Sequence, residues 1–265
     1  METTRPVAGA KARINVDVPI PIMPAISGKI VMERKAGNSE IKLEKPVELP
    51  RYWGSDIRER VALLGENGAG KSTTIRIISG LMKPDSGMVR IYGHRPSSIE
   101  AKRHIGYLPE DASPYLNLSV RENLEYIGTI RRTENLQDRI DFFLDMLDLR
   151  EMEKQKPLTL SRGNRQKLCL ALSIIHQPRF AIMDEPLNYL DIPTQEKVFE
   201  YFEKMNATFL VSTHILSIAR RLTSKVIILS SGKKVWEGQI SELEELTEGT
   251  KTIESIVSEL MKHVS

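Results

Sequence analysis

Gly65-Glu66-Asn67-Gly68-Ala69-Gly70-Lys71-Ser72-Thr73 is the stretch that decides the fold of this 265-residue chain. It fits the pattern G-x-x-x-x-G-K-[ST] and directly follows an apolar strand pattern, Val61–Leu64. The glycines allow positive φ, so successive N–H groups can turn toward an anion, and the helix expected from Lys71 adds the positive end of its dipole. The stretch therefore predicts a phosphate-binding loop and a chain that binds a nucleoside triphosphate.

The residue types of this loop match that chemistry. Lys71 adds a full positive charge, and the hydroxyl of Ser72 is the expected ligand of Mg²⁺, which prefers hard oxygen donors. A glycine-rich turn that happens to precede a helix is the alternative, and the strand before it and the helix after it both disfavour that interpretation. The residues expected to bind the nucleotide are Gly65, Asn67, Gly68, Ala69, Gly70, Lys71, Ser72 and Thr73.

Composition excludes several classes of protein. A net charge of +3 is too mild to imply a nucleic-acid partner, and no cluster of Lys and Arg with interleaved aromatics is present. The single cysteine, Cys169, stands in an apolar run and is expected to be a buried thiol, which fits a reducing cytosol. The apolar piece Val16–Pro24 is broken by three prolines and predicts neither a signal segment nor a membrane span. Any membrane role would therefore need a partner chain.

Strand patterns surround the phosphate loop. The segments Lys29–Glu33 and Ile41–Glu44 alternate like half-buried strands, and the residues before Gly28 suggest an extended arm or edge strands. Met88–Tyr92 follows a turn, and the wholly apolar Phe180–Met183 predicts a buried strand. The sequence thus predicts an α/β fold with a mostly parallel sheet and an antiparallel portion at the N-terminus.

A helical block from Asp111 to Ser161 interrupts this plan. Ser119-Val120-Arg121-Glu122 is a capping box that predicts the start of an amphipathic helix, and a second helix is expected over Ile140–Leu149. Three residues of the second helix are spaced for one face and are expected in the core: Phe142, Phe143 and Met146. We expect this block to be an inserted helical sub-domain.

Asp184 and Glu185 follow the strand Phe180–Met183 at its carboxyl end, where open α/β sheets place ligands. Asp184 can hold Mg²⁺ through water, and Glu185 can orient or deprotonate an attacking water molecule. Alone, the pair would be a solvated strand end. Behind a phosphate loop and an apolar strand, a catalytic role is favoured.

Leu160-Ser161-Arg162-Gly163-Asn164-Arg165-Gln166 resembles the LSGGQ signature of the ATP-binding cassette (ABC) ATPases, the nucleotide-binding subunits of ABC transporters. Arg162 replaces the first of the paired glycines, and Asn164 replaces the glutamine. The resemblance covers the chain from about Val61 to the C-terminus. Taken alone, the motif could be a helix capped by Ser161.

In this family the signature faces a γ-phosphate held by the opposite subunit, so that two cassettes enclose two ATP molecules head to tail. The resemblance therefore implies a homodimer or cassette dimer in the ATP-bound state, with Ser161 and the Gly163 N–H at the phosphate. Either Arg162 or Arg165 would add positive potential there.

Three shorter matches follow in the family's order. Ile105–Glu110 resembles the Q-loop, with Glu110 where glutamine is typical and a metal contact implied. Asn188–Asp191 resembles the D-loop, with Tyr189 as a bulky departure. Phe209–His214 ends in the family's switch histidine, and His214 would bridge the γ-phosphate and Glu185. The resemblance thus implies ATP hydrolysis by in-line attack of water, with Lys71, Glu185 and His214 as catalytic residues.

One expected feature is absent from the sequence. The family usually stacks adenine on an aromatic residue about two dozen positions before the phosphate loop, but Gly37–Leu43 contains none. The only upstream aromatics are Tyr52 and Trp53, which could equally pack the antiparallel edge. Specificity for ATP over GTP therefore rests on the resemblance alone.

The division expected for the chain is a single ABC ATPase domain. Its parts are an N-terminal β arm and antiparallel portion at 1–60, an ATPase core at 61–110 and 166–240, a helical sub-domain at 111–165, and C-terminal helices at 241–265. In the last part, Ile253–Val264 is expected to be a packing helix or a dimer contact.

Two functions remain open at this point. The first is the ATP-binding subunit of an ABC transporter, most similar to the export-type single cassettes, which would dock on an integral membrane permease at the cytoplasmic face of the membrane. The alternative is a soluble ABC ATPase that acts as a conformational switch without transport. A regulatory module without turnover is disfavoured because both Glu185 and His214 are present. The sequence names no transported substrate.

Overall fold

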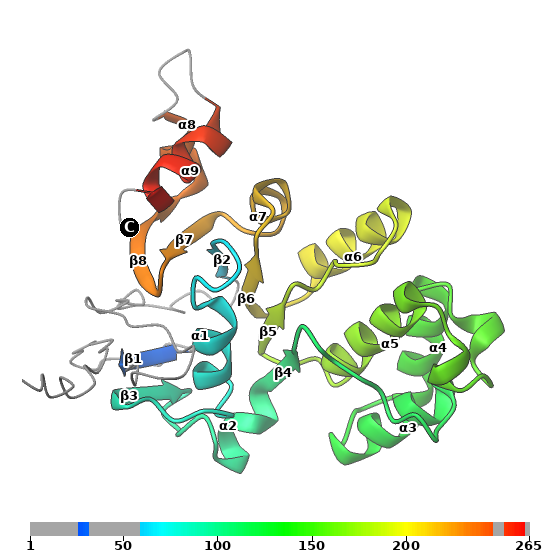
Figure 1. Cartoon of the computed structure of the whole chain (residues 1–265). Coiled ribbons are helices and arrows are strands. Elements are labelled where there is room, and N and C mark those ends of the chain that lie inside the picture. Colours follow the sequence, from blue (N-terminus) through cyan, green and yellow to red (C-terminus); the bar gives the residue numbers. More distant parts are fainter. Residues whose placement is uncertain (1–25, 32–58, 246–251, 263–265) are drawn as a thin grey trace, which may run out of the picture.

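The computed structural model describes residues 26–31, 59–245 and 252–262, and its main feature is a six-stranded sheet (Figure 1). The strand order is β4-β5-β6-β2-β7-β8, in which β8 pairs antiparallel with β7 and the others pair parallel. The strands are β4 (Ile105–Leu108), β5 (Phe180–Asp184), β6 (Thr208–Thr213), β2 (Arg60–Leu64), β7 (Lys225–Ser230) and β8 (Lys233–Gln239). Every residue of β5 and β6 is buried, as expected for parallel strands covered on both faces.

A two-stranded antiparallel sheet lies beside the main sheet and confirms the predicted antiparallel portion. It pairs β1 (Ile26–Val31) with β3 (Ser86–Ile91), with Ile26 opposite Ile91. Both strands start two or three residues earlier than the sequence pattern predicted. The segment Ile41–Glu44, together with Tyr52 and Trp53, lies outside the described residues.

Strand β2 shows how the sheet is covered on its two faces. Val61 and Leu63 pack into the cluster that contains Ile75 of α1 (Lys71–Ile78), whereas Ala62 and Leu64 pack on the other face. Helices α7 (Leu216–Leu222), α8 (Ile240–Glu245) and α9 (Ile253–Lys262) supply the partners on that second face. The segment expected to be a packing helix or a dimer contact thus packs on the sheet through Ile256 and Val257 of α9, and residues 263 and 264 lie outside the described residues.

The helical sub-domain projects to one side of the sheet (Figure 1). Its elements are α3 (Val120–Ile130), α4 (Leu136–Met146), the short 3₁₀ turns Arg150–Met152 and Pro157–Thr159, and the start of α5 (Arg162–Ile174). The predicted capping box is formed, because the Ser119 Oγ accepts from the Glu122 N–H at 3.2 Å and the Glu122 carboxylate accepts from the Ser119 N–H at 2.6 Å. One hydrophobic cluster runs from Leu124 and Phe143 to Met183, so the sub-domain and the core share buried contacts.

The second predicted helix needed correction. Helix α4 begins four residues before Ile140 and ends at Met146. Its buried stripe holds Ile140, Phe143 and Leu144, whereas Phe142 is 44% exposed and does not belong to the core. Adjacent helical residues point about 100° apart, so Phe142 and Phe143 do not share one narrow face.

Two further helices complete the described fold. Helix α2 (Ile99–His104) leads directly into β4, and α6 (Ile192–Lys204) connects β5 to β6. The β5–α6–β6 connection brings the carboxyl ends of two neighbouring parallel strands to one edge of the sheet. That edge carries the candidate site.

Candidate nucleotide-binding and catalytic site

The phosphate loop occupies the turn between β2 and α1. Gly68 has φ 82° and Gly70 has φ 103°, a left-handed conformation that side chains rarely adopt. Gly70 is the N-cap of α1, so the helix starts at Lys71 as predicted. The Lys71 ammonium is buried and donates to the carbonyls of Gly65 at 2.7 Å and Glu66 at 3.2 Å. These bonds hold a full positive charge within the loop that the sequence assigns to phosphate.

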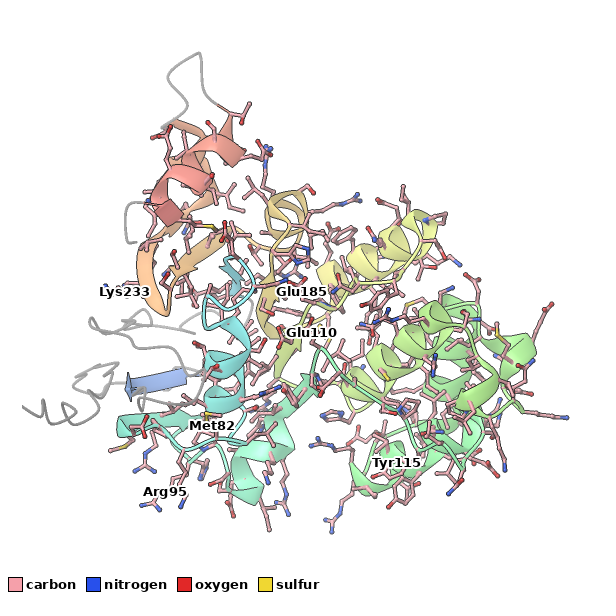
Figure 2. The ribbon with its side chains drawn as sticks, viewed as in Figure 1. Met82, Arg95, Glu110, Tyr115, Glu185 and Lys233 are labelled. Atoms are coloured by element: carbon pink, nitrogen blue, oxygen red, sulfur yellow. The ribbon has the colours of Figure 1, made fainter. Side chains whose placement is uncertain are left out.

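Asp184 ends strand β5 and Glu185 follows it, and Figure 2 labels Glu185 at this end of the strand. Asp184 and Glu185 are only 3% and 6% exposed. Glu185 has φ 50°, so the backbone takes a left-handed turn directly after the strand. Glu110 follows the neighbouring strand β4 and is exposed. Asp184 and Glu185 thus lie at the carboxyl end of β5 as predicted, and Glu110 follows the adjacent parallel strand.

Ser212 gives Asp184 a partner that no motif identifies. The Ser212 hydroxyl donates a short hydrogen bond to Asp184 Oδ1, and both side chains are buried. The two residues are direct partners in the parallel register of β5 and β6. The signal that could have found this contact is the alignment of the two strand ends, because residues opposite each other in a sheet share a face.

His214 and Glu185 form the predicted contact. His214 Nδ1 lies 2.7 Å from Glu185 Oε1. Because a carboxylate oxygen can only accept, Nδ1 carries the proton and Nε2 remains available on the other side of the ring. The Glu185 side chain is 6% exposed and the His214 side chain 48%. The imidazole thus connects a buried carboxylate to the open side of the site.

The resembled signature lies at the start of α5. Ser161 is the N-cap of this helix and its Oγ accepts from the Asn164 N–H at 3.1 Å. One turn further on, the buried Gln166 side chain donates to the Pro186 carbonyl at 3.0 Å. The first turns of α5 are therefore fixed against the segment that follows Glu185, which we call loop 186–191.

Asp191 closes loop 186–191 by capping α6. Its carboxylate accepts from the Thr194 N–H at 2.8 Å, and this backbone hydrogen bond lowers the pKa of Asp191 below its usual range. The resembled D-loop is therefore a turn held between β5 and the next helix. The geometry gives Asp191 a structural role within its own chain.

The site residues fall into two groups. A cavity of about 370 Å³ beside the phosphate loop is lined in part by Gly65, Asn67 and His214. In the part of the chain that the structure describes, no residue of 160–166 lines this cavity. Gly163 instead lies beside Tyr189 of loop 186–191. The structure thus brings together the phosphate loop, the strand-end carboxylates and His214, and it leaves the signature on a separate surface.

A phosphate loop between a buried strand and a helix, with carboxylates at the neighbouring strand ends, defines a P-loop nucleoside triphosphatase. The family model for ABC transporters matches residues 56–188, about half of the sequence. The chain belongs to the ABC transporter family, and it has the fold of an ATP-binding subunit of such a transporter.

Individual relatives agree with this assignment. The uncharacterized ABC transporter ATP-binding protein YxlF of Bacillus subtilis is 34% identical over 191 residues, which cover 71% of this chain and 64% of YxlF. The molybdate/tungstate import ATP-binding protein WtpC of Archaeoglobus fulgidus is 31% identical, with 81% of this chain and 88% of WtpC covered. A solved ATP-binding subunit of an ABC transporter superposes with a TM-score of 0.70 at 30% identity, covering 77% of this chain and 88% of that one.

Proposed function

We propose that two copies of this chain close head to tail over two Mg-ATP molecules, and that hydrolysis drives movement of a substrate through a separate integral membrane partner. The observation that carries this proposal is the hydrogen-bonded pair of Glu185 and His214, which lies at the same sheet edge as the phosphate loop. A buried carboxylate held by an imidazole is suited to orient the water that attacks a γ-phosphate. This pairing supports turnover rather than passive nucleotide binding.

The charges of the site suit each step of this reaction. Lys71 neutralises the β- and γ-phosphates, together with the N–H groups of the loop. His214 fixes the position of the Glu185 carboxylate through Nδ1, which leaves Nε2 as the nitrogen that would face the terminal phosphate. Glu185 accepts the proton of the attacking water. The opposing signature would supply the remaining charge stabilisation in the closed dimer.

The donor set of the site fits Mg²⁺. Helix α1, which carries the Ser72 hydroxyl, contacts strand β5, which ends in the buried Asp184 carboxylate. Oxygen donors with few carboxylates are typical for this ion, which keeps several water ligands and bridges phosphates. We propose Ser72 and Asp184 as its protein ligands, with Glu110 as an outer contact. The ion would neutralise charge that develops on the phosphates.

A surface groove supports the proposed membrane partner. A cavity of about 220 Å³ lies between the segment after β4 and the helical sub-domain, with Tyr107, Pro109 and Ile127 among its lining. Tyr115 and Tyr126 pack edge to face with ring centroids 4.9 Å apart, yet they are 51% and 44% exposed. Figure 2 shows Tyr115 on the sub-domain, away from Glu185. Exposed rings beside a groove are typical of a docking surface for a helix of a partner chain.

No helix within 59–245 or 252–262 has the length and apolar character needed to cross a bilayer. Membrane attachment at the cytoplasmic face is therefore proposed to come through the partner. The importer WtpC is among the relatives, so the export-type character expected from the sequence stays a prediction.

The test is the Glu185→Gln variant, which keeps the shape of the side chain and removes the base. We expect ATP-dependent conversion of monomer to dimer in size-exclusion chromatography, with phosphate release about 10²- to 10⁴-fold slower than in the unchanged chain. Glu151→Gln, at an exposed position in the sub-domain, controls for loss of one negative charge. Unchanged phosphate release by Glu185→Gln would exclude the assigned base. Co-purification with an integral membrane protein separates the transporter from a soluble switch.

A further inference from the structure

The two bulkiest departures from the family's motifs lie in contact with each other. The guanidinium carbon of Arg162 lies 3.7 Å from the centroid of the Tyr189 ring. Arg162 is the first residue of α5, and Tyr189 lies in loop 186–191. Both side chains are at the surface, and Tyr189 is 52% exposed. An exposed arginine stacked on an exposed ring at this distance is a defined cation–π pair.

The backbone holds the ring in place under the guanidinium. Tyr189 has φ 66°, an unusual conformation for a bulky residue that persists only where its surroundings enforce it. The Tyr189 carbonyl packs against Gly163 so closely that a Cβ there would lie 2.8 Å from the oxygen. The hydrogen bond from Gln166 to Pro186 fixes the other end of the loop. Loop 186–191 and the first turn of α5 therefore form one unit.

The stacked guanidinium keeps its donors available. Over the residues that the structure describes, the Arg162 side chain makes no hydrogen bond and no ion pair. Stacking uses the face of the guanidinium, so all of its N–H groups remain at the edge, in the geometry that binds phosphate oxygens. The ring also restricts the side chain, so less conformational freedom is lost when an anion binds.

Arg165 is the other residue that could add positive potential beside the signature, and its environment differs from that of Arg162. It is partly buried and lies one turn along α5 from Cys169. Burial raises the pKa of the Cys169 thiol to about 12, and the charge of Arg165 acts in the opposite direction. Arg165 thus lies close enough to Cys169, which lines the groove of the helical sub-domain, for its charge to act on that thiol, and it has no ring stacked on it in the described part of the chain.

We propose that Arg162, held face-on by Tyr189, contacts the γ-phosphate bound by the opposite subunit, and that these two departures from the family pattern act as a pair. Arg162 would be a phosphate-binding residue of the composite site, and Tyr189 a positioning residue that acts through it. This inference rests on the head-to-tail dimer of the proposed function.

The experiment measures the dissociation constant of the ATP-bound dimer in the Glu185→Gln background, by analytical ultracentrifugation with Mg-ATP. The added changes are Arg162→Ala, Tyr189→Phe, Tyr189→Leu, the combination of Arg162→Ala with Tyr189→Leu, and Arg165→Ala as the matched comparison. We expect Arg162→Ala to weaken the dimer at least about tenfold, because a charge-assisted hydrogen bond is lost in each site. Tyr189→Phe keeps a ring and should match the parent, whereas Tyr189→Leu should weaken the dimer about two- to fivefold.

Binding of a fluorescent ATP analogue to the monomer and the melting temperature serve as readouts of a purely structural role. Both should be unchanged by Arg162→Ala, and the combined variant should be no weaker than Arg162→Ala alone, because Tyr189 acts only through the arginine. A parent that dimerises with ATP while Arg162→Ala dimerises equally well overturns the inference and leaves the proposed function intact. If Arg165→Ala weakens the dimer more than Arg162→Ala does, the inference is likewise overturned and the proposed function stays intact. A Glu185→Gln parent that stays monomeric overturns both.

Discussion

Replacement of Ser212 by alanine tests the contact that holds Asp184 in place. The variant removes one hydroxyl at the end of β6 and leaves the Asp184 carboxylate buried without that donor. A hydrogen bond to a charged group contributes about 1.5–3 kcal/mol to stability. For a domain of this size, 1 kcal/mol corresponds to about 2–4 °C in melting temperature, so we expect a loss of about 3–12 °C.

Ser173→Ala is the matched control. Ser173 is also a buried serine, but its hydroxyl donates at 2.7 Å to the neutral carbonyl of Leu170. Loss of a neutral hydrogen bond costs about 0.5–1.5 kcal/mol, and alanine within a helix offsets part of that cost. Differential scanning fluorimetry of both variants without nucleotide should therefore show the larger decrease for Ser212→Ala.

Activity gives a second, independent readout of the same change. If Ser212 orients the carboxylate that holds Mg²⁺, Ser212→Ala should raise the magnesium concentration needed for half-maximal ATP hydrolysis. Loss of a residue that hydrogen-bonds to a metal ligand typically lowers metal affinity about 10- to 100-fold. Ser173→Ala should leave that concentration unchanged. Equal melting temperatures for the two serine variants, with the same magnesium dependence, would refute the role that we assign to Ser212.

Two further predictions concern the pKa values of groups outside the site. Burial raises the pKa of the Cys169 thiol to about 12, so we expect no reaction with Ellman's reagent at pH 8 in the folded protein and one thiol per chain in guanidinium chloride; rapid reaction of the native thiol would contradict this. Hydrogen bonds from Arg150 and Arg121 lower the pKa of Asp141. The ionised Asp141 carboxylate therefore stabilises the fold at pH values above the ordinary carboxyl pKa, and this stabilisation is lost as the pH falls through the lowered pKa of Asp141. The difference in melting temperature between the unchanged chain and Asp141→Asn should therefore be present at pH 7 and shrink below about pH 4; a pH-independent difference would count against the ion pair.

Features set by a few neighbouring residues were predictable from the sequence. The start of α1 at Lys71 follows from Gly70 and the loop pattern, and the start of α3 follows from the capping box at Ser119. Strand β5 was recognised because a short apolar run ends in two carboxylates. In each case the interactions that define the feature lie within one turn or one strand, so local sequence contains them.

The limits of α4 depend on tertiary contacts and were not predictable in the same way. The helix starts after Asn135, which has φ 50° and makes no side-chain cap, so no capping signal marks it. Its register against the sub-domain decides that Phe143 is buried and that Phe142 is exposed. An apolar residue at the margin of a helix face can take either state, and the neighbouring helices select one.

The pairs that matter most for function join residues far apart in the sequence. Sequence comparison with the family pattern identifies Arg162 and Tyr189 only as two separate losses of a small residue. In the structure they are a single stacked pair, and the tight approach of Tyr189 to Gly163 explains how the loop can carry a large side chain there. Two residues that each depart from a motif when considered singly can therefore form one charged element when they fold against each other. The dimerisation assay decides whether that element serves the opposing nucleotide.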